Sequence, residues 1–261
     1  MAASPSSLDA LRAEIRAIER SAAPAAARPA VPFGLRAVDG RLAAGGLNPA
    51  LHEAAAASLS AGDDAAATLF LAALAARFSR TGGQKGQVLW AMVRHDLFAP
   101  GLAQAGLTPD RLLCAQCRDD AELLAVMEEG VRHGSLAAVI GEVKRADMAA
   151  TRRLQLAAEE GGTPAFLLRR WRRADAEPLA APSAACTRWR IRCAPSSPLP
   201  FGIDPSEGLG RPRWRVGLVR QRGGPSYEWL LEAPDAEACF ALPAAAGDGA
   251  DRQSGAERRA A

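Results

Sequence analysis

The last third of the chain holds the residues with the clearest chemical potential, because arginines there surround tryptophans. Trp171, Trp189 and Trp214 each have arginines on both sides. Guanidinium groups bind phosphates and aromatic rings stack on nucleobases, so this composition predicts contact with single-stranded DNA. An acidic protein partner fits the charges equally well. The candidate contact residues are Arg188, Arg190, Arg192, Arg211, Arg213, Trp214, Arg215, Arg220 and Arg222.

A second interpretation makes the tryptophans core residues and the arginines a solvated face. Between 187 and 193 apolar residues such as Trp189 and Ile191 alternate strictly with arginines, which is the pattern of a strand with one dry side. This alternation favours burial of Trp189. The position of Trp214 separates the two partners, because only stacking on bases requires an exposed ring.

Acidic residues are scarce among these arginines. Asp204 and Glu207 are the only two between 188 and 222. We therefore expect that the arginines cannot all be paired internally, and that they form a positive surface around the loop from 194 to 212. Long loops of this kind are often functional.

Residues for catalysis or metal binding do not form a recognisable group. Cys114 and Cys117 make a C-x-x-C pair at the end of a predicted strand, whereas redox pairs open a helix, and no second ligand pair follows at a zinc-site spacing. The chain has no G-x-S-x-G motif, and its carboxylate pairs lie on predicted helices. We expect no catalytic, cofactor-binding or metal-binding residue.

The composition is typical of a folded, water-soluble protein. The 261 residues are 49% hydrophobic and carry a net charge of +3. Five cysteines are an odd number, which argues against a disulfide framework. No apolar stretch reaches the length of a membrane span, and the first twenty residues lack the apolar core of a secretory leader. We expect a cytoplasmic protein with no membrane partner.

The elements that position these residues alternate between short apolar runs and helical patterns. This order predicts an α/β fold with a mainly parallel central sheet flanked by helices. Later alternating runs predict an antiparallel extension of that sheet. The expected helices are 65–77, 100–105, 119–133 and 147–160, and the expected strands are 51–54, 87–93, 112–115, 136–143, 165–168, 186–193, 213–222 and 227–233.

Several short segments stand in a distinctive order along the chain. They are GGL and LHE within 45–53, VLWAMVRHDLFAPGLAQAGLTPDRLL at 88–113, GSLAAVIGEV at 134–143, TRRLQLAAEEGG at 151–162, TRWRI at 187–191 and GLGRPRWRVGLVRQRGG at 208–224. Their order and spacing resemble the RecA-like ATPase core. More closely, they resemble the ImuA family of damage-inducible mutagenesis proteins, which are RecA-like. The resemblance covers roughly residues 33–233.

A RecA-like core implies a phosphate-binding loop, G-x-x-x-x-G-K-S/T, after the strand at 51–54. Residues 54–67 contain no Gly–Lys pair. Asp63 and Asp64 stand there instead, and their carboxylates would repel phosphate oxygens. Lys85, in the Gly-rich stretch at 82–86, fits a turn between a helix and a strand better than a displaced phosphate loop.

The acidic residues of an ATPase are also displaced. Gly141 occupies the usual place of the Mg²⁺-binding acid, and a shift of one residue along a strand predicts that Glu142 points to the opposite face. Asp96 follows a strand where a water-activating acid is expected, but without a phosphate loop it has no reaction to assist. We expect neither ATP hydrolysis nor a bound cofactor.

The sequence pattern, together with the resemblance, divides the chain into four expected parts. We expect an N-terminal amphipathic helix at 1–20, a Pro/Ala linker at 21–32, the RecA-like domain at 33–243 and a disordered tail at 244–261. An isolated helix this short is marginal in water, so it needs a surface to lie on. RecA-like proteins use such an element to reach a neighbour, which suggests RecA itself or a second copy in a homo-oligomer. The apolar stripe of this partner helix is Leu8, Leu11, Ile15 and Ile18.

The resemblance implies a non-catalytic adaptor of SOS-induced translesion DNA synthesis. Such an adaptor would recruit or organise an ImuB-like Y-family polymerase homologue and an error-prone DnaE-like polymerase at damaged DNA. Two alternatives remain open at this point. One is a RecA-like ATPase with a reshaped site, which would bind nucleotide. The other is a SulA-like inhibitor of cell division, which would bind a tubulin-like division protein.

Overall fold

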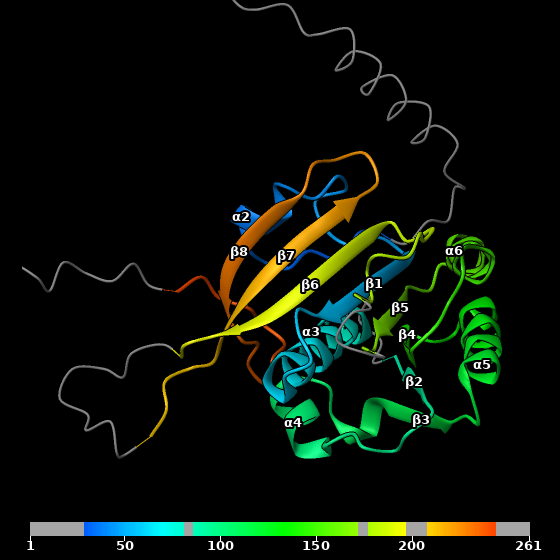
Figure 1. The fold of residues 1–261 in the computed structure, drawn as a ribbon, viewed down its shortest axis with the longest axis horizontal. Coiled ribbons are helices and arrows are strands. Elements are labelled where there is room, and N and C mark those ends of the chain that lie inside the picture. The colour runs from blue at the N-terminus through cyan, green and yellow to red at the C-terminus, as the bar shows by residue number, and fades with distance from the viewer. Residues whose placement is uncertain (1–28, 81–85, 172–176, 197–207, 244–261) are drawn as a thin grey trace, which may run out of the picture.

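The computed structural model describes residues 29–80, 86–171, 177–196 and 208–243. One eight-stranded sheet runs through it in the order β3-β2-β4-β5-β1-β6-β7-β8 (Figure 1). The strands are β1 (Leu51–Ala56), β2 (Val88–Met92), β3 (Leu112–Gln116), β4 (Ala138–Val143), β5 (Ala165–Arg169), β6 (Thr187–Ala194), β7 (Arg213–Gln221) and β8 (Tyr227–Glu232). The helices are α2 (Arg36–Asp39), α3 (Ala61–Arg80), α4 (Ala99–Gln104), α5 (Asp120–His133) and α6 (Met148–Gly161), with a 3₁₀ turn η1 at Pro109–Arg111.

The first six strands are parallel, and β7 and β8 are antiparallel. The predicted α/β fold, with a mainly parallel central sheet flanked by helices and an antiparallel extension, is confirmed. All the predicted strands and the four predicted helices are present. The carboxyl ends of the parallel strands meet at one edge of the sheet, which is where open α/β sheets bind ligands.

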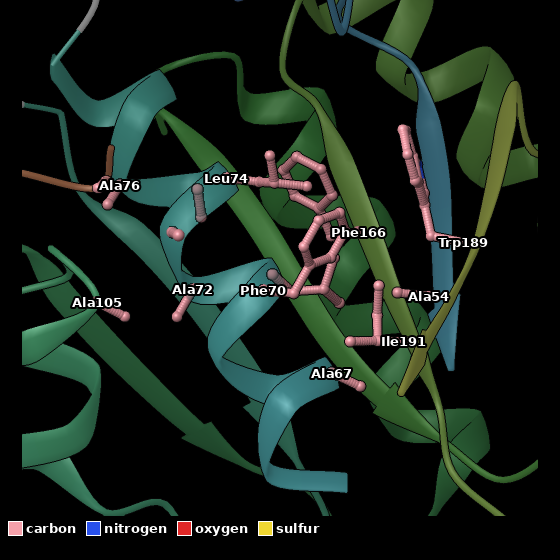
Figure 2. Packing of buried hydrophobic residues seen from close by; sticks show 14 of the residues in the cluster. Ala54, Ala67, Phe70, Ala72, Leu74, Ala76, Ala105, Phe166, Trp189 and Ile191 are labelled. Carbon is pink, nitrogen blue, oxygen red and sulfur yellow. The ribbon is translucent and has the colours of Figure 1, made fainter. Parts of the chain in front are cut away.

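Helix α3 packs on one face of the sheet and is buried on most of its surface. Alanines on several sides of α3 let neighbouring elements approach closely, while Phe70 and Leu74 supply the bulk. Figure 2 shows Phe70, Leu74 and Phe166 meeting between α3 and the sheet. Helix α3 is therefore a central element of the fold, and its N-terminus lies at the carboxyl edge of the sheet.

Helices α5 and α6 cover the other face over β2, β4, β5 and β1 (Figure 1). Both begin at an aspartate whose side chain accepts backbone N–H groups of the first turn: Asp119 caps α5 and Asp147 caps α6. Both end at a glycine in the left-handed conformation, Gly134 and Gly162. These caps fix where the two helices begin and end beside the carboxyl edge.

An aromatic cluster joins the two ends of the described chain to the middle of the fold. Phe33 lies 5.5 Å from both Trp189 and Phe240, measured between ring centroids, and Phe70 of α3 lies against all three. Val31, inside the predicted linker, pairs with Leu47 through two backbone hydrogen bonds. The folded core therefore includes residues slightly before Phe33.

The predicted N-terminal helix and the predicted C-terminal tail lie outside the described residues, as do Lys85 and the stretch 197–207. Within the ranges that are described, no helix is both long and apolar enough to cross a membrane.

His52 is fully buried in β1 and belongs to a closed hydrogen-bond chain. Its Nε2–H donates to the carbonyl of Asn48 (2.9 Å), and its Nδ1 accepts from the hydroxyl of Thr187 (2.8 Å). That hydroxyl in turn accepts the indole N–H of Trp189 (2.7 Å). Burial lowers the pKa of His52 from 6.5 to about 4, so the ring is neutral at pH 7.

This histidine should make stability depend on pH. As the pH falls below 6.5, the unfolded chain protonates at His52 before the folded chain does, so the free energy of unfolding should decrease between pH 6.5 and pH 4, by up to roughly 3 kcal/mol. Urea unfolding across this range should show a smaller slope for His52→Gln than for the wild type. His133→Gln, at an exposed histidine, should keep the wild-type slope. Equal slopes for all three proteins would contradict the assignment.

Candidate functional site

A cleft of about 940 Å³ opens at the carboxyl edge of the sheet. It is lined by loops that follow five parallel strands, in the position expected for a nucleotide. Many of the lining residues are charged. The charged residues are Asp64, Arg94, Arg118, Asp119, Asp120, Glu142, Lys144, Arg145 and Arg170.

The loop between β1 and α3 cannot surround a phosphate. Strand β1 ends at Ala56 and α3 begins at Ala61, so four residues remain where the phosphate-binding motif needs eight. The N-terminus of α3 is also satisfied from within, because the Ser60 hydroxyl accepts the backbone N–H of Asp63 (3.1 Å). The absence of a Gly–Lys pair in the sequence therefore corresponds to the absence of a loop that could bind phosphate.

Asp63 closes this corner further. Its carboxylate accepts the Ser58 hydroxyl (2.6 Å) and the backbone N–H of Cys193 (2.7 Å), which ties α3 to the end of β6. A buried carboxylate with these bonds puts negative charge at the helix N-terminus, where an anionic ligand would have to sit. The predicted repulsion of phosphate at Asp63 and Asp64 agrees with this geometry.

Arg170 occupies the middle of the site and joins three elements. Immediately after β5, its guanidinium binds Asp64 of α3 (Nη1–Oδ2 2.5 Å) and Glu142 of β4 (Nη2–Oε2 2.9 Å). The other oxygen of Glu142 accepts the indole N–H of Trp90 (2.8 Å). Burial lowers the pKa of Arg170, but the two carboxylates outweigh burial and raise it overall. The chain thus fills the centre of the cleft with its own ion pairs.

Glu142 does lie on the opposite face of β4 from Gly141, as the alternation predicted, but the cleft is on the side of Glu142 and not on that of Gly141. A Cβ on Gly141 would lie 2.1 Å from the sulfur of Met127, so it is Gly141 that faces α5. Glu142 consequently faces the α3 side and lines the cleft. It is nevertheless engaged by Trp90 and Arg170, and is not open to a metal ion.

The other acids of the cleft also have internal partners. Asp119 caps α5, and Asp120 accepts the backbone N–H groups of Lys144 (3.3 Å) and Arg145 (2.8 Å). The side chains of Lys144 and Arg145 form no ion pair with any residue in the described ranges. The cleft is therefore a polar surface with surplus positive charge.

The remaining acid considered for water activation is engaged too. Asp96 pairs with Arg94 at 3.0 Å, and both side chains are exposed.

The cysteines are free thiols. Burial raises the pKa of Cys114 and of Cys117, so both thiols are protonated at neutral pH, whereas nucleophilic and metal-binding cysteines are thiolates. In the part of the chain that the structure covers, no three His, Cys, Asp or Glu residues are grouped closely enough to hold a metal ion.

The tryptophans of the arginine-rich segments face inward. Trp189 is fully buried, as the strand pattern predicted, and Trp214 is only 3% exposed, packed against Phe240. Trp171 is half-buried, and its indole N–H donates to the carbonyl of Ala56 (2.8 Å). The rings of Trp189 and Trp214 are therefore not free to stack on a base.

Arg188 is a structural residue and was wrongly included among the contact candidates. It is buried and bonds through Nε to Oε2 of Glu53 (2.7 Å), a carboxylate with no exposed surface. The other oxygen of Glu53 accepts the Ser183 hydroxyl (2.8 Å) and lies 3.8 Å from Nη1 of Arg169. This cluster joins β5, β1 and β6 in the interior of the fold.

Internal partners are more numerous than the sequence suggested, although not all of these arginines are paired. Asp204 and Glu207 are the only acids nearby in sequence, but the fold brings acids from β8, α6 and the 177–185 segment. Arg213 and Arg220 instead donate to backbone carbonyls. The ion pairs are Arg190–Glu177, Arg211–Glu232, Arg215–Glu228 and Arg222–Glu159.

Arg192 is the exception in this group. It is exposed at the end of β6 and has no side-chain bond to any described residue.

Nothing in the sequence around Arg170 indicates its role. Its partners Asp64 and Glu142 lie on elements that are far away in the chain. Only the strand order, which puts β5 between β4 and β1, brings the three together.

The chain is 41% identical over 213 residues to Protein ImuA of Caulobacter vibrioides strain NA1000 / CB15N. The aligned region spans 80% of this chain and 85% of the relative. Protein ImuA of the C. vibrioides strain ATCC 19089 matches equally well. No protein-family model matches.

One solved structure has limited similarity. SulA from Pseudomonas aeruginosa covers 46% of this chain and 98% of its own length, at 24% identity and a TM-score of 0.38. This likeness carries no argument about function.

Removing the guanidinium at the centre of the cleft should cost stability. Arg170→Met keeps an unbranched apolar stem but removes the guanidinium, which leaves Glu142, whose side chain is 7% exposed, without its cation. We expect the free energy of unfolding to fall by about 3 kcal/mol, as for other broken buried pairs. Urea unfolding would measure this. Arg94→Met, at a side chain that is 72% exposed, should change it by less than about 1 kcal/mol. Equal effects of the two substitutions would contradict a central role for Arg170.

Proposed function

This chain belongs to the ImuA family, and from that premise we propose that it acts in damage-inducible mutagenesis as a non-catalytic RecA-like adaptor. Its work in this proposal is binding, and no nucleotide is turned over. The observation that carries the non-catalytic part is the ion-pair network of Arg170, Asp64 and Glu142 in the nucleotide position.

Three features of the cleft support this reading. The loop before α3 is too short for a phosphate-binding motif, Asp63 and Asp64 put negative charge at the helix N-terminus, and Glu142 is already bonded on both oxygens. ATP hydrolysis needs a phosphate cradle and a metal ligand, and these positions hold neither. The RecA-like sheet is retained in this proposal as a scaffold for contact surfaces.

The partners we propose are an ImuB-like Y-family polymerase homologue and an error-prone DnaE-like polymerase, brought together at damaged DNA. RecA, or a second copy of this chain, is proposed as the surface on which the predicted N-terminal helix docks. That helix lies outside the described residues, and its apolar stripe is the basis of the proposal.

Purified protein should neither hydrolyse ATP nor bind Mg²⁺–ATP more tightly than the millimolar range, because the segment after β1 lacks the glycines and lysine of a phosphate-binding motif and places Asp63 and Asp64 at the start of α3. Isothermal titration and a phosphate-release assay would measure both. Tight, Mg²⁺-dependent binding would contradict the proposal and favour the reshaped ATPase.

The role in mutagenesis is tested in cells. Deleting the gene should abolish most mutations induced by ultraviolet light while leaving the spontaneous mutation frequency unchanged, and the wild-type gene should restore the induced mutations. An unchanged induced frequency in the deletion strain would refute the proposed function.

A further inference from the structure

One face of the sheet is only partly covered by helices. On that face α5 and α6 cover β2, β4, β5 and β1, and β6, β7 and β8 extend beyond them (Figure 1). The uncovered part is called the open face below. Glu53, Arg188, Arg190 and Arg192 all lie on this helix-covered side, because Glu53 is paired in register with Arg188 and side chains repeat every two residues. From Arg190 onward the arginines of β6 are exposed.

Two pairs of arginines stand directly opposite each other on β6 and β7. The register pairs Arg188 with Arg220 and Arg192 with Arg215. Like charges directly opposite in an antiparallel pair destabilise the sheet, so each pair needs compensation.

The first pair is compensated inside the protein. Glu53 binds Arg188 at 2.7 Å, and Arg220 donates to the carbonyl of Ser183 at 2.8 Å. The acid at its centre is completely buried. Arg188 is therefore part of the core, and Arg220, although exposed, is held by a backbone carbonyl.

The second pair lacks such compensation. Arg192 has no ion pair with any residue of the described ranges, and Arg215 has only an exposed contact with Glu228 at 3.5 Å. Arg213, two residues from Arg215 on the same face, is held by the carbonyls of Pro195 and Ser196. Three guanidinium groups are therefore gathered at one end of the open face without a strongly bound acid.

We propose that Arg192, Arg213 and Arg215 form a docking surface for an acidic segment of a protein partner. This inference rests on the proposed function, in which the partner is the polymerase homologue. Arginine binds carboxylates through two parallel hydrogen bonds, which gives such a surface specificity as well as attraction.

The surroundings favour a peptide over nucleic acid. The tryptophans of β6 and β7 point to the core, so no described ring is offered for base stacking here. Glu228 and Glu232 border the arginines on β8, so a nucleic-acid backbone, which carries a charge at every nucleotide, would meet them as it crosses the arginines, whereas a peptide can carry acidic residues at the arginines and neutral ones beside the glutamates. A peptide can place carboxylates at the arginines and an apolar side chain at half-buried Leu230, which lies opposite Arg215.

The test uses the full-length chain and the double variant Arg192→Ala plus Arg215→Ala. The matched control is Arg36→Ala plus Arg152→Ala, which removes two exposed arginines elsewhere that have no described side-chain partner. The probes are the purified polymerase homologue, a glutamate-rich peptide and a single-stranded oligonucleotide. Dissociation constants are measured at low and moderate salt.

We expect the double variant to bind the polymerase homologue and the peptide at least about tenfold more weakly, with a reduced salt dependence, while the control binds like the wild type. The melting temperature of the double variant should equal or exceed that of the wild type, because the substitutions remove the repulsion between Arg192 and Arg215. A stable variant with weakened binding separates docking from a folding defect.

Other outcomes overturn the inference in distinguishable ways. Unchanged binding of the polymerase homologue by the double variant refutes the docking surface and leaves the proposed function standing. Binding of the peptide but not the polymerase homologue, lost in the double variant, supports the surface and contradicts the proposed partner. An acidic protein ligand is refuted if the wild type binds neither the polymerase homologue nor the peptide. It is also refuted if the double variant loses binding of the oligonucleotide but keeps binding of the polymerase homologue and the peptide.

Discussion

The guanidinium of Arg170 is the interaction on which the carboxyl edge of this protein depends. It binds one acid from α3 and one from β4, and the next residue, Trp171, is bonded to the end of β1. These contacts hold the ends of β1, β4 and β5 and the start of α3 together. Open α/β sheets bind ligands at this edge, so the ion pairs of Arg170 occupy the place where a ligand would lie.

The arginines of β6 and β7 differ in role because Arg188 has a buried acidic partner, whereas Arg192 has none and Arg215 has only an exposed one. Arg188 meets Glu53 in the interior, where an unpaired charge would be very costly, and so it stabilises the contact of β6 with β1. Arg192 and Arg215 face solvent at the far end of the same ladder and keep most of their binding capacity. A single strand thus changes from a structural element to a surface for contact within a few residues.

The fold was predictable to the level of elements and their order. Apolar periodicity identified β1 to β8 and the four longer helices, and the start of α3 moved only from Ala65 to Ala61, where Ser60 provides the cap. The site was less predictable, because the partners of Arg170 and Arg188 come from other elements. Alternation buried Trp189 correctly, but it could not reveal that β8 and α6 supply acids to the later arginines.

An adaptor without nucleotide chemistry should bind its partner in the same way whether or not ATP is present. The most direct measurement is the dissociation constant between this chain and the purified ImuB-like polymerase homologue, first in nucleotide-depleted buffer and then with millimolar Mg²⁺–ATP. The account predicts equal, specific binding in both conditions. Binding that appears only with ATP, or that ATP dissolves, would contradict it.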